Sequence, residues 1–315
     1  MRFLLAHPNP EPLAHLLQSV FPKLDLVVAR DDVAPRYLQD VDILLTIGRW
    51  LTAEHVVRAS RLRWIQCLIT GTEHIEPLLR RRPDVLLTNA RGIHGAQMTE
   101  AALTHMLVLI RQVPRLLCNQ KQAQWQPFTP RVLEGKTAVI LGSGAIAQHM
   151  ARVLSLMDMR VLGVSAAPRQ EEGFQAIVAR SAVHVAVAEA DFVINLLPMS
   201  EENRHFVDAR FWHGCKRECV FINLGRGGTV DTSALIGVLK DGKISAAGLD
   251  AFELTPLPTD SPLWTMPNVF ITPGLAGRSD NYDMKLMSIL EANIPRFLHG
   301  EVGKMVNRVL ISIEY

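Results

Sequence analysis

A short glycine-rich segment in the middle of the chain has the residue types needed to bind phosphate. It follows an apolar run at residues 137–141 and reads Gly142-Ser143-Gly144-Ala145-Ile146-Ala147. Gly142 allows a tight turn, Gly144 lets the backbone approach a pyrophosphate, and the small Ala147 lets a helix pack closely on the strand. The N–H groups at the start of that helix attract phosphate. The pattern therefore predicts a dinucleotide-binding turn. The residues expected next to the cofactor are Gly142, Gly144, Ala145 and Ile146.

The end of the next predicted strand, residues 161–164, is where such a protein distinguishes NAD from NADP. An Asp or Glu at this point would hold the ribose 2′-hydroxyl of NAD. Here the strand leads instead to Ser165, and Arg169 follows four residues later. Ser165 can donate a hydrogen bond to a 2′-phosphate, and Arg169 can pair with it. The sequence favours NADP(H), with NAD(H) as the alternative. Arg169 could also be a solvated loop cation.

The composition gives little support to other kinds of chemistry. The net charge is +2, from 33 basic and 31 acidic residues, so we expect neither nucleic acid nor a membrane surface as a partner. The four cysteines are scattered, and the histidines lack the spacing of a zinc site, so no metal is expected. We find no signal peptide and no segment that could span a bilayer. We therefore expect a cytoplasmic protein with reduced thiols.

Two series of short apolar runs, separated by amphipathic segments, predict the elements that position these residues. Runs without polar alternation are typical of parallel strands covered on both faces. The expected strands of the first series are 3–6, 24–29, 41–47, 64–69 and 85–88, and those of the second are 137–141, 161–164, 192–197, 219–223, 244–249 and 269–272. The expected helices are 11–20, 52–60, 97–122, 145–156, 232–240 and 283–299. The fold class is therefore α/β, with two doubly wound, Rossmann-like parallel-sheet domains and a cleft between them.

The segment 97–122 is the longest expected helix and connects the two series. Thr99 is its expected N-cap, and Pro114 should kink or break it. Its apolar residues lie on more than one face, as in a helix that forms an interface. We therefore expect a homodimer, although the same apolar surface could be ordinary core.

Several motifs together resemble the D-isomer-specific 2-hydroxyacid dehydrogenases, the group that contains glyoxylate/hydroxypyruvate reductases. The resemblance covers essentially the whole chain. The matching segments are Leu196-Leu197-Pro198, Ile222-Asn223-Leu224-Gly225-Arg226-Gly227-Gly228, Gly248-Leu249-Asp250-Ala251-Phe252-Glu253, Pro256-Leu257, Gly71-Thr72-Glu73-His74, and Thr88-Asn89 through Glu100. The resemblance implies a flavodoxin-like substrate domain made of residues 1–96 and 284–315. It also implies a dinucleotide-binding Rossmann domain at 97–283 and dimers through the 97–122 region.

The resemblance also implies roles for individual residues. Arg226 would hold the substrate carboxylate and polarise its 2-oxo group, because a planar bidentate donor suits a 2-keto acid. Asp250 would hold the nicotinamide carboxamide, and Glu253 would orient a histidine that donates a proton. Further cofactor contacts are expected at Leu197, Pro198 and Leu224. The substrate carboxylate would also meet the backbone N–H groups of Gly71 and Thr72, and Trp50 should shape the choice of substrate.

The sequence departs from the family pattern at the proton donor. The family's histidine follows a strand in a Thr/Ser-Pro-His motif, whereas this chain has Gly274 after Pro273. Glu253 thus lacks its expected partner. His94 is the first candidate for a replacement acid and His74 the second, although a lone histidine is most often structural. Glu253 itself could donate the proton if burial raised its pKa.

Three hypotheses about function remain open at this point. The first is an enzyme that reduces a small 2-keto acid of the glyoxylate or hydroxypyruvate type to the D-2-hydroxy acid. The second is a catalytically impaired paralogue that binds the dinucleotide as a sensor or regulator, which the absence of a histidine at Gly274 favours. The third is that Gly274 is an artificial change in an otherwise active enzyme.

Overall fold

The computed structural model describes residues 1–311, and the chain divides into two compact units. Unit 1 contains Met1–Ile93 and the segment from Ser279 onward, and unit 2 contains His94–Arg278. These boundaries lie three and five residues before those expected from the sequence. The last four residues of the expected substrate domain, 312–315, lie outside the described part.

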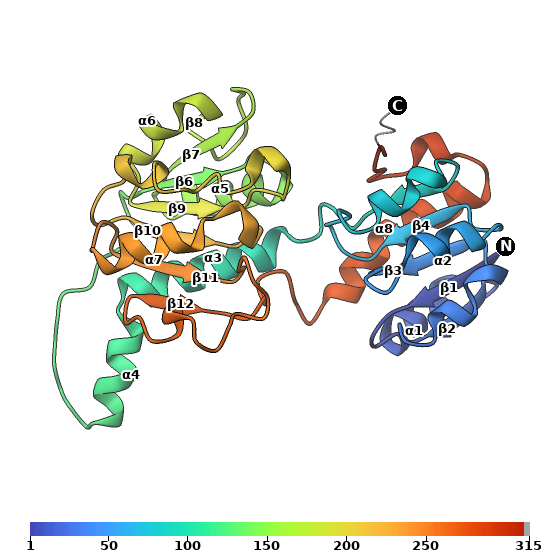
Figure 1. Ribbon diagram of the computed structural model, residues 1–315, viewed down its shortest axis with the longest axis horizontal. Coiled ribbons are helices and arrows are strands. Elements are labelled where there is room, and N and C mark those ends of the chain that lie inside the picture. The colour runs from blue at the N-terminus through green and yellow to red at the C-terminus, as the bar shows by residue number, and fades with distance from the viewer. Residues whose placement is uncertain (312–315) are drawn as a thin grey trace. The chain divides into compact units, whose positions relative to one another are not determined.

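Unit 1 is built on a five-stranded parallel sheet in the order β2-β1-β3-β4-β5 (Figure 1). This is the flavodoxin-like order of a doubly wound sheet. Its strands are β1 (Arg2–Ala6), β2 (Asp25–Ala29), β3 (Ile43–Thr46), β4 (Trp64–Cys67) and β5 (Leu86–Thr88). Its α-helices are α1 (Glu11–Val20), α2 (Ala53–Arg58) and, from the end of the chain, α8 (Tyr282–Leu298).

Unit 2 is built on a seven-stranded parallel sheet in the order β12-β11-β10-β9-β6-β7-β8. The order reverses between β6 and β9, which is the switch point of a Rossmann fold and the place where dinucleotides bind. Its strands are β6 (Thr137–Leu141), β7 (Arg160–Ser165), β8 (Ala176–Ala179), β9 (Phe192–Asn195), β10 (Val220–Asn223), β11 (Ala246–Leu249) and β12 (Val269–Ile271). Its α-helices are α3 (Gly95–Ile110), α4 (Val113–Lys121), α5 (Ala145–Leu156), α6 (Val183–Ala188) and α7 (Thr232–Lys240).

Each sheet has an apolar core on both faces. Along β1, Phe3 and Leu5 enter one core while Leu4 and Ala6 enter the other. The same alternation in β6 sends Val139 to one core and Ile140 to the other. Helices cover both faces, so these strands can be apolar throughout, which is why they were visible in the sequence.

The expected helix 97–122 is two helices. Helix α3 ends at Ile110, Gln112 adopts a left-handed backbone (φ 53°), and α4 begins at Val113 with Pro114 in its first turn. The two axes are bent by 60°. The break near Pro114 is confirmed, but Thr99 is not the N-cap: α3 begins at Gly95, and the Thr99 hydroxyl donates to the Gly95 carbonyl (2.7 Å).

No single helix in residues 1–311 has the length and hydropathy of a membrane span. Helices α3 and α4 pass that test only as a bent pair.

Candidate active site

The glycine turn lies at the switch point of the unit 2 sheet. Gly142 follows β6 with a positive φ of 108°, and its N–H donates to the Val164 carbonyl of β7 (2.8 Å). A β-carbon at Gly142 would lie 3.6 Å from the carbonyl oxygen of Leu196, which directly follows β9. The expected cofactor residues after β6 and after β9 therefore meet at the crevice where the strand order reverses.

The first turn of α5 fits the pyrophosphate of a dinucleotide. Gly144 is the N-cap of α5 with an extended backbone (φ −74°, ψ −176°), and no side chain caps the helix. A β-carbon at Gly144 would meet no atom within 4 Å, whereas Ala147 is buried in the core. Packing within the described chain thus explains the small Ala147 but not Gly144. Space beside unpaired N–H groups at a helix start suits a phosphate.

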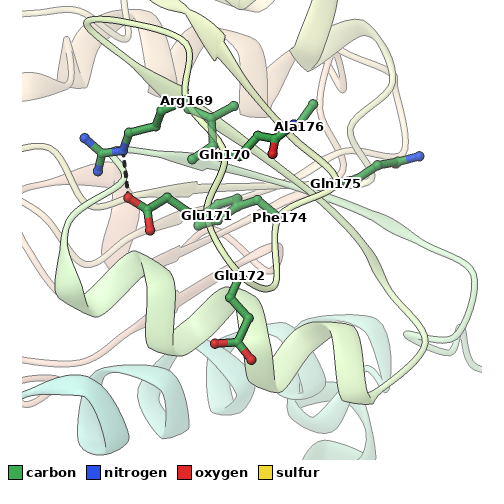
Figure 2. A pocket seen from close by; sticks show the side chains of 8 residues that line it. Arg169, Gln170, Glu171, Glu172, Phe174, Gln175 and Ala176 are labelled. Carbon is green, nitrogen blue, oxygen red and sulfur yellow. Dashed lines mark ion pairs between the residues drawn. The ribbon is translucent and has the colours of Figure 1, made fainter.

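The expected ribose end of the site contains an acid that the sequence interpretation missed. The Arg169 side chain pairs with the Glu171 carboxylate (Nε to Oε1, 3.1 Å) and donates to the Ser143 carbonyl of the glycine turn. Figure 2 shows the two side chains directed toward each other, and both line a cavity formed by residues 169–177. The expectation of an acid-free ribose site is therefore corrected. The Ser165 hydroxyl donates to the Ala167 carbonyl (2.6 Å).

A buried amide network holds the loops that follow β9 and β10. The Asn195 amide donates to Asn223 Oδ1 (2.9 Å) and to the Thr229 hydroxyl oxygen (2.7 Å). Asn195 Oδ1 accepts from the Leu197 N–H, and the Asn223 amide donates to the Ala251 carbonyl after β11. All three network side chains are almost fully buried. Because a buried polar group is costly to leave unpaired, this network fixes three strand ends together.

Arg226 lies on a loop pressed between the β9 and β11 loops. A β-carbon at Gly225 would lie 2.9 Å from the Leu197 carbonyl oxygen, and one at Gly227 would lie 1.9 Å from that of Phe252. Only glycines allow such close approach of backbones. Arg226 is exposed between them. In Gly225-Arg226-Gly227, the backbone on both sides of Arg226 is thus closely packed, while the arginine side chain is exposed.

Asp250 holds the loop in which the family's histidine would stand. Its Oδ1 accepts from the Thr272 hydroxyl (2.5 Å) and the Leu275 N–H (2.8 Å), and its Oδ2 accepts from the Ala276 N–H (3.0 Å). Gly274 between them has φ 69°, and its N–H donates to the Asp250 carbonyl (3.2 Å). A side chain at position 274 would meet no atom at its β-carbon, but it would strain the left-handed backbone.

Helix α3 places a buried histidine against the same loop. His105 Nε2 lies 3.0 Å from the Thr272 hydroxyl oxygen. That hydroxyl already donates to Asp250, so the ring must supply the proton of this hydrogen bond. Burial lowers the pKa of His105 to about 4, and the opposing effect of Asp250 is smaller. The neutral ring therefore supports Thr272 and Asp250 at physiological pH.

Glu253 has a histidine partner that the sequence interpretation did not identify. His205 Nε2 lies 2.6 Å from Glu253 Oε1, and the Thr232 N–H at the start of α7 donates to Oε2 (3.4 Å). Burial raises the pKa of Glu253, but these hydrogen bonds outweigh it and hold the pKa below its usual value. Glu253 thus faces His205 and α7, and it does not lack a partner. Its lowered pKa does not favour the idea that Glu253 itself donates a proton.

The two candidate replacement histidines lie in different units. His94 is the N-cap residue of α3, is 8% exposed, and its Cδ2 lies 3.8 Å from where a β-carbon of Gly277 would be. It is thus close to the loop that contains Gly274. His74, in unit 1, hydrogen-bonds through Nε2 to the Ile47 carbonyl (2.7 Å) and joins the loops after β3 and β4.

The expected substrate residues of unit 1 lie on these same two loops. The Thr72 hydroxyl donates to Glu76 (2.6 Å), and its carbonyl accepts from the Ile75 and Glu76 N–H groups, so it organises the turn that follows Gly71. Trp50 Nε1 donates to the Thr46 hydroxyl oxygen (3.2 Å) at the end of β3.

The described part of the chain was also searched for side chains that could bind a metal ion. Within residues 1–311, no group of three or more His, Cys, Asp or Glu side chains could hold a metal ion.

Comparisons with known proteins agree with this geometry. A family model described as "D-isomer specific 2-hydroxyacid dehydrogenase, NAD binding domain" matches residues 103–276. The chain is 30% identical over 288 residues to a glyoxylate reductase of Pyrococcus furiosus, a match that covers 88% of this chain and 85% of that protein.

Solved structures of the same kind superpose on nearly the whole chain. A D-isomer specific 2-hydroxyacid dehydrogenase family protein from Aeromonas salmonicida has a TM-score of 0.89 at 33% identity and covers 99% of both chains. An NADPH-dependent glyoxylate/hydroxypyruvate reductase from Sinorhizobium meliloti, in complex with NADP and sulfate, has a TM-score of 0.83 at 26% identity and covers 98% of both chains. The chain therefore belongs to the D-isomer specific 2-hydroxyacid dehydrogenase family, whose members are NAD(P)-dependent oxidoreductases.

Proposed function

We propose that this protein reduces a small 2-keto acid of the glyoxylate or hydroxypyruvate type to the D-2-hydroxy acid, with NADP(H) as the preferred dinucleotide. The main observation behind the proposal is the position of the loop that contains Arg226. This loop packs against Leu197, which lies at the switch point beside the glycine turn. One guanidinium fixed next to a dinucleotide crevice suits a substrate that carries a carboxylate and an adjacent carbonyl.

The residues of this chain take the following roles. A reduced nicotinamide, when bound, would supply the hydride. Arg226 binds the substrate carboxylate and polarises the carbonyl. Asp250 fixes the loop 272–276 and holds the carboxamide side of the cofactor site. The backbone N–H groups of Gly71 and Thr72 receive the carboxylate, and Trp50 limits the size of the substrate side chain.

The cofactor would lie along the loops of unit 2. Gly142, Gly144, Ala145 and Ile146 form the pyrophosphate turn, and Leu197, Pro198 and Leu224 line the crevice beside it. Ser165 and Arg169 would contact the 2′-phosphate of NADP(H). The complex of the similar Sinorhizobium meliloti reductase with NADP supports this preference.

His94 is our candidate for the proton donor in place of a histidine at position 274. His94 and His105 are both buried beside the loop that contains Gly274, but the His105 ring is engaged with the Thr272 hydroxyl, whereas the His94 ring approaches Gly277. Replacement of His94 by Gln should lower kcat and remove the fall of kcat at alkaline pH that loss of a proton donor causes, while the Kd for NADPH stays unchanged. An unchanged kcat would exclude His94.

The impaired-paralogue hypothesis makes a distinct prediction, which NADPH oxidation can test over a panel of 2-keto acids. If the natural chain turns over, the enzyme is complete without a histidine at 274. If it binds NADPH but only Gly274→His turns over, the chain is a binding paralogue. Gly274→Asn serves as the control for the left-handed backbone, because Asn tolerates this conformation but supplies no acid.

We also propose a homodimer and a reducing, cytoplasmic location. Helix α4 has no buried residue, and its Leu116 and Leu117 are 43% and 53% exposed. Figure 1 shows α4 extending from the sheet of unit 2. Exposed apolar side chains on one helix suit an interface with a second copy. All four cysteines are free thiols, which supports the reducing location.

A further inference from the structure

The connection between β7 and β8 is a firmly anchored hairpin. Arg169 and Ile177 form an antiparallel bridge across it. At its tip, Gly173 has φ 84°, and a β-carbon there would lie 2.5 Å from the Arg152 backbone nitrogen of α5. The Ser155 hydroxyl of α5 donates to the Gly173 carbonyl (2.7 Å). The positions of residues 169 and 171 are therefore set by the fold.

This hairpin places the Glu171 carboxylate beside Arg169, the arginine expected to contact the ribose end of the dinucleotide. Arg169 contacts Glu171 on one side (3.1 Å) and the Ser143 carbonyl of the glycine turn on the other. The two charged side chains are 46% and 30% exposed, so a ligand can reach them. They lie at a cavity of about 360 Å³ (Figure 2).

The single positive charge of Arg169 cannot neutralise both a carboxylate and a phosphate. The 2′-phosphate of NADP(H) would therefore compete with Glu171 for Arg169, and the nearby carboxylate would repel the phosphate. NAD(H) has no phosphate at this position, so it would leave the ion pair intact. A carboxylate near the ribose can also accept a hydrogen bond from a 2′-hydroxyl.

We propose that Glu171 limits the preference of this protein for NADP(H): it competes with the 2′-phosphate for Arg169 and so narrows the difference in affinity between NADP(H) and NAD(H). This inference rests on the proposed function, since it requires that a nicotinamide dinucleotide occupies the crevice. Glu171 acts on the affinity for the dinucleotide and takes no part in hydride transfer.

The test is titration calorimetry of the whole protein with NADPH, NADH and the fragment 2′,5′-ADP. Because exposed ion pairs are weak, Glu171→Gln should increase the affinity for NADPH and for 2′,5′-ADP by only about 3- to 10-fold. The affinity for NADH should stay the same or decrease. In the Arg169→Met background, the same change should alter NADPH affinity much less.

Glu172→Gln is the matched control. It removes the same charge from the neighbouring residue, whose side chain is directed at Arg152 of α5 (3.5 Å) and away from Arg169. If Glu171→Gln and Glu172→Gln tighten NADPH equally, the effect is general electrostatics and the inference is wrong. If neither variant changes the ratio of NADPH to NADH affinity, the inference also fails. The failure of the natural protein to bind either dinucleotide would instead overturn the proposed function.

Discussion

Gly227 and Gly144 are glycines for different physical reasons, and this difference can be measured. A β-carbon at Gly227 would overlap the Phe252 carbonyl at 1.9 Å, whereas one at Gly144 would meet nothing. We predict that Gly227→Ala lowers the free energy of unfolding by about 1–3 kcal/mol or prevents folding, as overpacking does. Gly144→Ala should leave this free energy almost unchanged but weaken NADPH binding at least about tenfold, because the pyrophosphate would meet the new methyl group.

Urea denaturation and NADPH titration of the two variants make this comparison. If Gly144→Ala were destabilised as much as Gly227→Ala, the glycine at 144 would serve packing. If it bound NADPH like the natural protein, the assignment of the pyrophosphate to this turn would be wrong.

At the same scale, single residues show what the sequence could and could not reveal. The positions of Gly142 and Arg226 just after β6 and β10 were predictable, because each lies in a local motif with a fixed relation to one strand end. The pairs Arg169–Glu171 and His205–Glu253 were not. The first depends on how a hairpin folds back, and the second joins residues 48 positions apart through loops without periodic patterns.

At the scale of elements, the parallel strands were readable because both faces are buried, so each appears as a continuous apolar run. The edge strand β8 (Ala176–Ala179) was missed. The break between α3 and α4 was predictable from Pro114. The start of α3 was not, because the side chain of its N-cap residue, His94, makes no capping hydrogen bond.

The contact of α3 with the end of β12 predicts how stability changes with pH. Burial lowers the pKa of His105 from 6.5 to about 4 in the folded state. Between these values the unfolded chain binds the proton more readily, so stability is full above about pH 6.5 and falls toward pH 4. At pH 5 the natural protein should lose about 2 kcal/mol through this group.

Urea denaturation at pH 7.5 and pH 5 can isolate this effect when His105→Gln is measured in parallel. Gln keeps an amide that can donate to Thr272 but does not titrate. The natural protein should lose about 2 kcal/mol more than the variant over this interval. Equal losses in both proteins would show that His105 does not titrate as its burial requires.

At the scale of the whole molecule, the chain passes between the two units twice, at residues 93–94 and 278–279. The family resemblance placed these crossings after residues 96 and 283, three and five residues further along the chain. The sequence evidence for a homodimer was the apolar surface of residues 97–122, which ordinary core packing would also explain. The exposed leucines of α4 supply a test of the proposed dimer.

We predict that Leu117→Glu converts the dimer to a monomer, because it places a charge in an apolar contact. Sedimentation equilibrium measures the mass, and Leu156→Glu is the control, since Leu156 is 85% exposed at the end of α5. A natural protein that is monomeric at all concentrations would refute the proposed assembly. A dimer unaffected by Leu117→Glu would place the interface elsewhere.

We propose above all that Arg226 directs a 2-keto acid toward a dinucleotide bound at the β6–β9 switch point. The most direct test of this claim is NADPH oxidation with glyoxylate and hydroxypyruvate, measured for the natural protein and for Arg226→Lys, together with the Kd for NADPH. Lys keeps the charge but loses the planar bidentate donor, so kcat/KM should fall by about 100-fold or more while the Kd for NADPH stays within a factor of about two. If the natural protein binds NADPH but oxidises it with neither acid, or if Arg226→Lys is as active as the natural protein, the claim is wrong.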